Sequence, residues 1–154
     1  MPTNRANWTH PDLQALAGLF FEECGELGQF TEVPPETLPT PYRELLGHTL
    51  HMTVTLERHH VSPVDVVVVD KHITDSHYAR KSLLRRRSDG TIVQFGVVRL
   101  ARPLLADDVR EEIEGESIPL GRVLIDHNVM RNVKLMSTWK IIPGPALREA
   151  FAPA

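Results

Sequence analysis

Apolar residues recur along this chain with two different periods, and each period predicts a type of secondary structure. Between residues 9 and 28 they lie three or four positions apart, which predicts a helix that Thr9 caps and that ends near Gly28. Residues 50–57 alternate between apolar and polar, which predicts a half-buried strand. The valine-rich run of residues 63–70 predicts a strand that is buried on both faces.

A hairpin is predicted over residues 78–100. Asp89-Gly90 separates two alternating segments there and suits the positive φ angles of a two-residue turn. With these two residues at the tip, counting outward along both strands places Arg80 opposite Arg99. Like charges directly across a sheet are destabilising. The arginine pair therefore predicts either an anion bound between the two side chains or pairing with carboxylates on neighbouring strands, such as Glu57, Asp65 or Asp70.

The remaining segments complete the pattern of an α+β protein. A short helix is predicted from Thr40-Pro41 to Gly47, and a longer one over residues 106–115. Ser117 is predicted to cap another short helix that has Pro119 in its first turn. Alternation over residues 133–142 predicts a final strand. The order helix, strands, helices, strand favours an α+β fold with a largely antiparallel sheet.

Length, composition and charge narrow the class of protein. The 154 residues fit a single domain, and 42% hydrophobic with 24% charged residues is typical of a globular chain. A net charge of -3 gives no general attraction to nucleic acid or anionic membranes, and no segment has the roughly 18 consecutive apolar residues of a membrane span. The basic triplet Arg85-Arg86-Arg87 is interpreted as a solvated hairpin tip, with a phosphate or partner contact as the alternative. One cysteine and no secretion signal indicate a cytosolic protein.

Familiar catalytic and metal-binding motifs do not occur in the sequence. The chain holds eight histidines, but none matches a zinc-binding spacing, and the neighbours His59 and His60 would point to opposite faces of a strand. Neither a G-x-S-x-G segment nor a glycine-rich phosphate loop is present. We therefore expect no metal and no cofactor. The remaining candidate is a site built around arginine, whose planar guanidinium group binds carboxylates through two parallel hydrogen bonds.

Several short segments carry a likeness to a known family. They are Met52-Thr53, Leu56-Glu57, Tyr78-Ala79-Arg80, Leu83-Leu84, Asp89-Gly90, Arg99 and Pro119-Leu120-Gly121-Arg122-Val123-Leu124. In their order and rough spacing they resemble the chorismate pyruvate-lyase (4-hydroxybenzoate synthase) family and its uncharacterised relatives, over about residues 46–131. The resemblance implies an antiparallel sheet of six strands with helices packed on one face, around a small internal cavity. It also implies removal of pyruvate from chorismate to leave a hydroxybenzoate, without metal or organic cofactor.

By matching position, the resemblance assigns roles to individual residues. Arg80 would hold a substrate carboxylate and Arg99 would support it, which is the pair that the hairpin register predicts. Met52 would pack on the ring, and Leu120 would form part of the cavity wall. In the family a glutamate on the last strand faces the ring hydroxyl, and Glu149 is its only nearby counterpart here, across a sizeable gap. Glu149 is therefore the expected second catalytic residue beside Arg80, with Glu57 or Asp126 as alternatives.

The leading hypothesis is a small cytosolic lyase-like enzyme that binds chorismate, or a related cyclic or aromatic carboxylate, and eliminates pyruvate. One alternative is a non-catalytic module that binds a small carboxylate. Another is a dehydratase or cyclase of secondary metabolism on the same scaffold. We expect no nucleic-acid or membrane partner, and both a monomer and a homodimer agree with the sequence.

Overall fold

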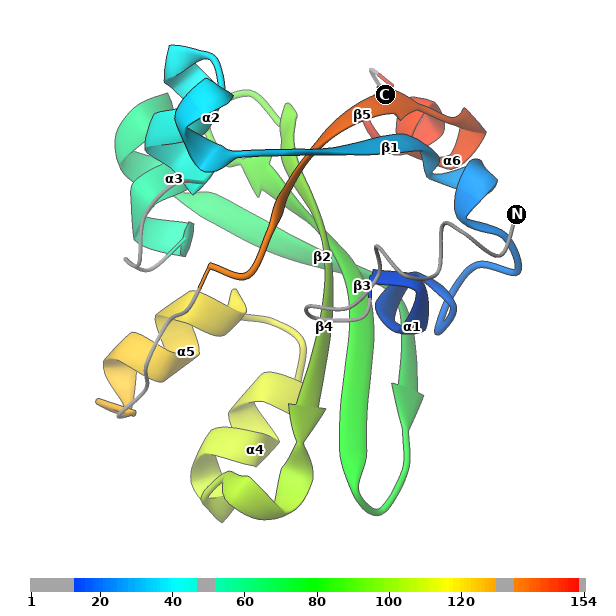
Figure 1. Cartoon of the computed structure of the whole chain (residues 1–154). Coiled ribbons are helices and arrows are strands. Elements are labelled where there is room, and N and C mark those ends of the chain that lie inside the picture. The colour runs from blue at the N-terminus through cyan, green and yellow to red at the C-terminus, as the bar shows by residue number, and fades with distance from the viewer. Residues whose placement is uncertain (1–12, 47–51, 130–134, 153–154) are drawn as a thin grey trace.

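The structure is a computed structural model that describes residues 13–46, 52–129 and 135–152 (Figure 1). Its helices are α1 (Leu13–Ala17), α2 (Thr40–Leu46), α3 (Met52–His60), α4 (Asp107–Glu114), α5 (Leu120–Asp126) and α6 (Pro145–Ala150). Its strands are β1 (Gly28–Val33), β2 (Val64–Ile73), β3 (His77–Arg86), β4 (Ile92–Ala101) and β5 (Thr138–Pro143). Short 3₁₀ turns lie at Cys24–Glu26, Pro35–Thr37 and Arg102–Leu104. Thr9, His48, His51 and residues 133–134 of the predicted last strand lie outside the described residues.

The strands form two antiparallel sheets, which confirms the α+β class and contradicts the expected six-stranded sheet. Strands β2, β3 and β4 make a three-stranded sheet in that order, and β1 pairs with β5 in a separate two-stranded sheet. The long valine run drives the formation of β2, which is longer than predicted. Strand β1 was not predicted from the sequence, because its pairing partner β5 lies more than 100 residues away along the chain.

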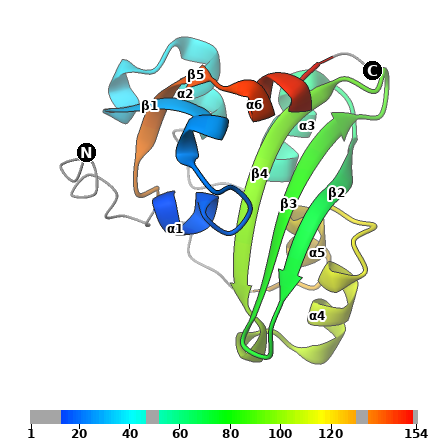
Figure 2. The same ribbon diagram turned by 90° about the vertical axis from the view of Figure 1, so that its right-hand side faces the viewer.

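Helices cover both faces of the three-stranded sheet, so the expectation of helices on one face is wrong. Helices α3, α4 and α5 lie on one side of the sheet, and α1 and α6 lie on the other (Figures 1 and 2). We call the side of α3, α4 and α5 the inner face and the side of α1 and α6 the outer face. This arrangement buries most of the central strand β3, whose side chains alternate between the two covered faces, while Arg85 near its end is exposed.

The inner face carries two hydrophobic clusters. In the first, Tyr78 packs against α4 and α5, and in the second, Leu84 packs against α3 and β2. The first cluster consists of Tyr78, Val109, Ile113, Val123 and Leu124, and the second of Leu56, Val64 and Leu84. A third cluster covers the outer face and consists of Ala17, Phe21 and Leu27, with Phe95 and Leu147 packed against it.

The turn of the β3–β4 hairpin is longer than predicted. The N–H of Arg86 donates to the carbonyl of Thr91 (2.8 Å), and the N–H of Gly90 donates to the carbonyl of Arg86 (2.8 Å). The carboxylate of Asp89 closes the turn by accepting from the N–H of Thr91 (3.0 Å) and from the Arg86 guanidinium. Gly90 has the predicted positive φ, at 77°. Even so, the chain turns over residues 87–91 rather than over two residues, and this changes the register.

The predicted pairing of Arg80 with Arg99 is wrong. The strands shift register after Leu84, so that Arg80 pairs with Val98, and Arg99 pairs with Ala79. Residues that pair directly share a face, whereas neighbours along a strand alternate. A shift of one residue therefore turns every side chain of one strand to the other face relative to its partner. Arg80 points to the inner face and Arg99 to the outer face.

The strand predicted over residues 50–57 is also wrong, because residues 52–60 form helix α3. Thr53 and Leu56 are its buried residues, and their spacing of three is that of a helix face. The alternation of Leu50, Met52, Val54 and Leu56 concealed this spacing, since Thr53 is polar and was counted as facing outward.

The first predicted helix is shorter than expected and a helix cap was misplaced. Helix α1 ends at Ala17, and the stretch predicted to continue it contains a 3₁₀ turn and the start of β1 at Gly28. The residue that precedes α5 is Pro119 rather than Ser117, and no side chain caps this helix.

The helices predicted near residues 41–47 and 106–115 are confirmed as α2 and α4. Within the described residues, no helix has the length and apolar character needed to cross a bilayer.

Candidate functional site

A buried arginine lies at the centre of the inner face. The side chain of Arg80 comes from the middle of β3, and the residue is only 2% exposed. Its Nη1 donates to the carbonyl of Ile113 at the end of α4 (3.3 Å). Its Nε has no hydrogen-bond partner, and none of the ion pairs among the described residues includes Arg80. A guanidinium stays charged at any physiological pH, so Arg80 is a buried cation with an unused donor.

Tyr78 lies two positions before Arg80 on the same face of β3. Its hydroxyl donates to Oε2 of Glu116 (2.9 Å), and Oε1 of Glu116 lies 3.3 Å from Nζ of Lys71. Burial and the hydrogen bond to Glu116 together raise the pKa of Tyr78 to about 12, although the neighbouring Arg80 guanidinium lowers it through hydrogen bonding and charge. The phenol is therefore neutral and keeps its proton. Tyr78, Glu116 and Lys71 form a polar chain that begins beside Arg80.

Glu116 lies in the short connector between α4 and α5. Its φ of 65° is in the left-handed region, which residues other than glycine rarely adopt. The next three residues of the connector, Ser117, Ile118 and Pro119, line a surface cleft. One segment thus joins the polar chain beside Arg80 to this cleft.

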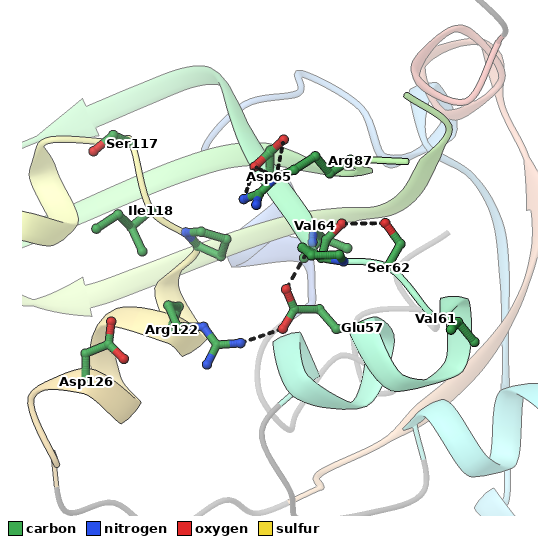
Figure 3. A pocket seen from close by; sticks show the side chains of 12 residues that line it. Glu57, Val61, Ser62, Val64, Asp65, Arg87, Ser117, Ile118, Arg122 and Asp126 are labelled. Carbon is green, nitrogen blue, oxygen red and sulfur yellow. Dashed lines mark hydrogen bonds and ion pairs between the residues drawn. The ribbon is translucent and has the colours of Figure 1, made fainter. Parts of the chain in front are cut away.

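The cleft has a volume of about 670 Å³ and lies between the end of α3, the start of β2 and helix α5 (Figure 3). Its walls combine apolar side chains with charges of both signs. Besides the connector, it is lined by Glu57, Val61, Ser62, Pro63, Val64, Asp65, Arg87, Arg122 and Asp126.

The two arginines of the cleft are held by carboxylates. Arg122 donates to Oε1 of Glu57, whose Oε2 accepts from the N–H of Val64 (3.0 Å), as Figure 3 shows. Arg87 donates to Asp65 through Nη2 (2.8 Å) and Nε (3.2 Å). The hydrogen bond from Arg87 lowers the pKa of the Asp65 carboxyl. Glu57 therefore connects α3, β2 and α5, and its carboxylate is already occupied.

The expected site residues divide between the two faces of the sheet. Met52 and Leu120 are half-buried on the inner face, where Met52 packs against the cluster of Leu84 and Leu120 against the cluster of Tyr78. Arg80 shares that face. Arg99 is exposed and points to the outer face.

Glu149 lies away from Arg80. It is an exposed residue of α6, and this helix packs through Ala146 and Leu147 on the outer-face cluster. The three-stranded sheet therefore separates the two residues that were expected to act together. Of the alternatives, Glu57 and Asp126 both line the cleft, and Asp126 is exposed there.

Sequence reasoning missed Tyr78 and Glu116 as members of the site. A signal for Tyr78 was available, because it precedes Arg80 by two positions and so shares its face of the strand. No comparable signal identifies Glu116, which meets Tyr78 only through the packing of α4 and α5 against the sheet.

Local contacts account for His59, His60 and two arginines of the basic triplet. His59 and His60 lie on helix α3 rather than on a strand, and their ring centroids are 4.9 Å apart. Among the described residues, no group of three or more His, Cys, Asp or Glu side chains is placed to hold a metal ion. In the triplet, Arg86 pairs with Asp89 and Arg87 with Asp65.

Comparison with known proteins gives no match to a protein-family model, a curated protein or a solved structure.

Proposed function

We propose that this protein binds a small carboxylic acid through Arg80 and that chorismate, cleaved to a hydroxybenzoate and pyruvate, is the first substrate to test. The observation that carries the proposal is the burial of Arg80 without an ion-pair partner among the described residues. Removing a cation from water costs several kcal/mol even after the protein relaxes, and a neutral carbonyl partner offsets only part of this cost. A ligand carboxylate supplies both the charge and the acceptor that Arg80 needs.

The surroundings of Arg80 suit an acid with a ring. Ile113 lies next to the guanidinium, and Tyr78 and Leu120 add aromatic and apolar surface to the cluster that contains Ile113. A flat aromatic or cyclic body packs well against such side chains, while its carboxylate reaches the buried cation. The connector of residues 116–119 lies between this region and the cleft, and we propose that the ligand enters there.

The cleavage of chorismate needs no external reductant or oxidant. The ether bond breaks at the ring carbon, and its electron pair leaves with the enolpyruvyl oxygen. The ring loses one proton and becomes aromatic, while the enolpyruvyl methylene gains one proton and becomes the methyl group of pyruvate. Fixed positive charge beside a substrate carboxylate and exclusion of water favour these changes.

A binding module without catalysis is the second candidate, and one observation favours it. Glu149 lies on the other face of the sheet from Arg80, and Glu57 is occupied by Arg122 and by the Val64 amide. A binding protein needs only the cation. The two candidates differ in whether chorismate is consumed.

The test combines calorimetric titration with 4-hydroxybenzoate and chromatographic detection of product from chorismate. The variant Arg80→Met removes the charge but keeps most of the buried volume, and Arg99→Met is its matched control on the opposite face. We expect Arg80→Met to lose roughly 2–5 kcal/mol of binding, and Arg99→Met to bind as the wild type does. Product from chorismate identifies a lyase, and tight binding without product identifies a binding module. No binding by the wild type, or equal losses in both variants, would overturn the proposal.

A further inference from the structure

Tyr78 and Arg80 reach the same point from adjacent positions on one face of β3. Both are almost completely buried, at 1% and 2% exposure. Ile113 of α4 belongs to the same hydrophobic cluster as Tyr78, its carbonyl accepts from Arg80, and the Arg80 guanidinium lies close enough to the Tyr78 hydroxyl to lower its pKa. A carboxylate that accepts from the free Nε of Arg80 would therefore lie next to the phenol of Tyr78.

Building on the proposed function, we propose that the Tyr78 hydroxyl is a second donor to the ligand carboxylate and that Glu116 competes for it. A carboxylate has two oxygens and accepts several hydrogen bonds, so one oxygen takes the Arg80 Nε–H and the other takes the Tyr78 O–H. In the structure that single phenol proton is donated to Glu116. When the ligand binds, the hydroxyl turns from Glu116 to the ligand.

This exchange costs little, because Glu116 keeps other partners. Its Oε1 lies next to the ammonium of Lys71, and its side chain is 21% exposed, so water replaces the hydroxyl. Tyr78 serves as a donor throughout, since its raised pKa keeps the phenol protonated. The recognised chemistry is that of an anion, because a neutral group does not compete with the Glu116 carboxylate for this proton.

The first experiment compares the affinity for 4-hydroxybenzoate by calorimetry. Tyr78→Phe keeps the buried ring and removes only the hydroxyl, and we expect it to weaken binding roughly 10- to 150-fold, as for loss of a hydrogen bond to a charged group. Glu116→Gln removes the competing charge, and we expect it to tighten binding several-fold. Tyr42→Phe is the control, because Tyr42 is 58% exposed on α2. Wild-type affinity in Tyr78→Phe, or weaker binding in Glu116→Gln, would contradict the proposed exchange.

The second experiment observes the phenol directly. The chain has two tyrosines, so protein labelled with ¹³C at the tyrosine ζ carbon gives two signals, which Tyr42→Phe assigns. We expect 4-hydroxybenzoate to move the Tyr78 signal and to leave the Tyr42 signal in place. If Arg80→Met abolishes binding while Tyr78→Phe does not weaken it and the Tyr78 signal is unchanged, this inference fails and the proposed function stands. If the wild type does not bind, both fail together.

Discussion

Gly121 lies where helix α5 crosses helix α3, and its replacement by alanine is a sharp test of how the inner face is packed. A Cβ atom at this position would lie 2.5 Å from Oγ1 and 3.0 Å from Cβ of Thr53. The first distance is about 1 Å shorter than ordinary contact between such atoms. Thr53 is only 5% exposed, and its branched side chain has few alternative rotamers, so the helices themselves must separate.

Two opposing terms set the expected size of the effect. Overpacking a buried contact costs about 1–3 kcal/mol, whereas alanine is favoured over glycine inside a helix by about 1 kcal/mol. We expect Gly121→Ala to lower the free energy of unfolding by about 1–2 kcal/mol, which corresponds to a Tm lower by about 2–8 °C for a chain of this size. Urea denaturation followed by circular dichroism measures the free energy, and differential scanning fluorimetry measures Tm.

A double-mutant cycle identifies the cause. If the clash with Thr53 is responsible, Thr53→Ala should cost less stability in the Gly121→Ala background than in the wild type, with a coupling of at least 0.5 kcal/mol or so. The reasoning is refuted if Gly121→Ala is as stable as the wild type, or if the two substitutions are additive. In that case glycine in the segment Pro119-Leu120-Gly121 would have to be explained by something other than helix packing.

Two further predictions concern stability. The hydrogen bond from His127 to Glu112 raises the pKa of this histidine above 6.5, so the stabilising ion pair is fully formed below about pH 6.5 and is lost as the pH rises through the raised pKa. His127→Asn should therefore cost more stability at about pH 5.5 than at about pH 8.5 in urea titrations, and an equal cost at both would show that the pair does not titrate in this way. Val61 follows the last residue of α3, has a φ of 50° and is 89% exposed, so Val61→Gly relieves a left-handed valine without losing packing and should stabilise the protein by about 0.5–1 kcal/mol. A lower Tm for this variant would contradict that interpretation.

The parts of the fold that were predicted correctly depend on local sequence. The valine run predicted β2, and the period of apolar residues predicted α4. Proline at the start and glycine after the end of the segment predicted α2. The two main errors arose where tertiary contacts decide. Helix α3 has a buried threonine because α5 approaches it closely at Gly121, and no pattern within residues 50–57 indicates this.

The site was predicted in part, and the reason lies in the hairpin turn. The place of Arg80 on a predicted central strand indicated that it is a candidate site residue. The residue that shares its face on the neighbouring strand could not be predicted in the same way. The face to which Arg99 points depends on the number of residues in the turn and on one bulge, and both escape the sequence pattern. Glu116 is 38 residues from Tyr78, and only the folded arrangement of α4 and α5 brings them together.

The solitary charge of Arg80 also affects how long the folded chain persists. An anion that binds only the native state stabilises it by RT ln(1 + [L]/Kd), about 2.7 kcal/mol at a hundredfold excess over Kd. Among the described residues, Nε of Arg80 is a buried donor without a hydrogen-bond partner, so an anion bound there would offset part of the cost of burying this charge. If the proposed acid binds at Arg80, it would slow degradation of the folded chain, and the protein would accumulate when that acid is plentiful.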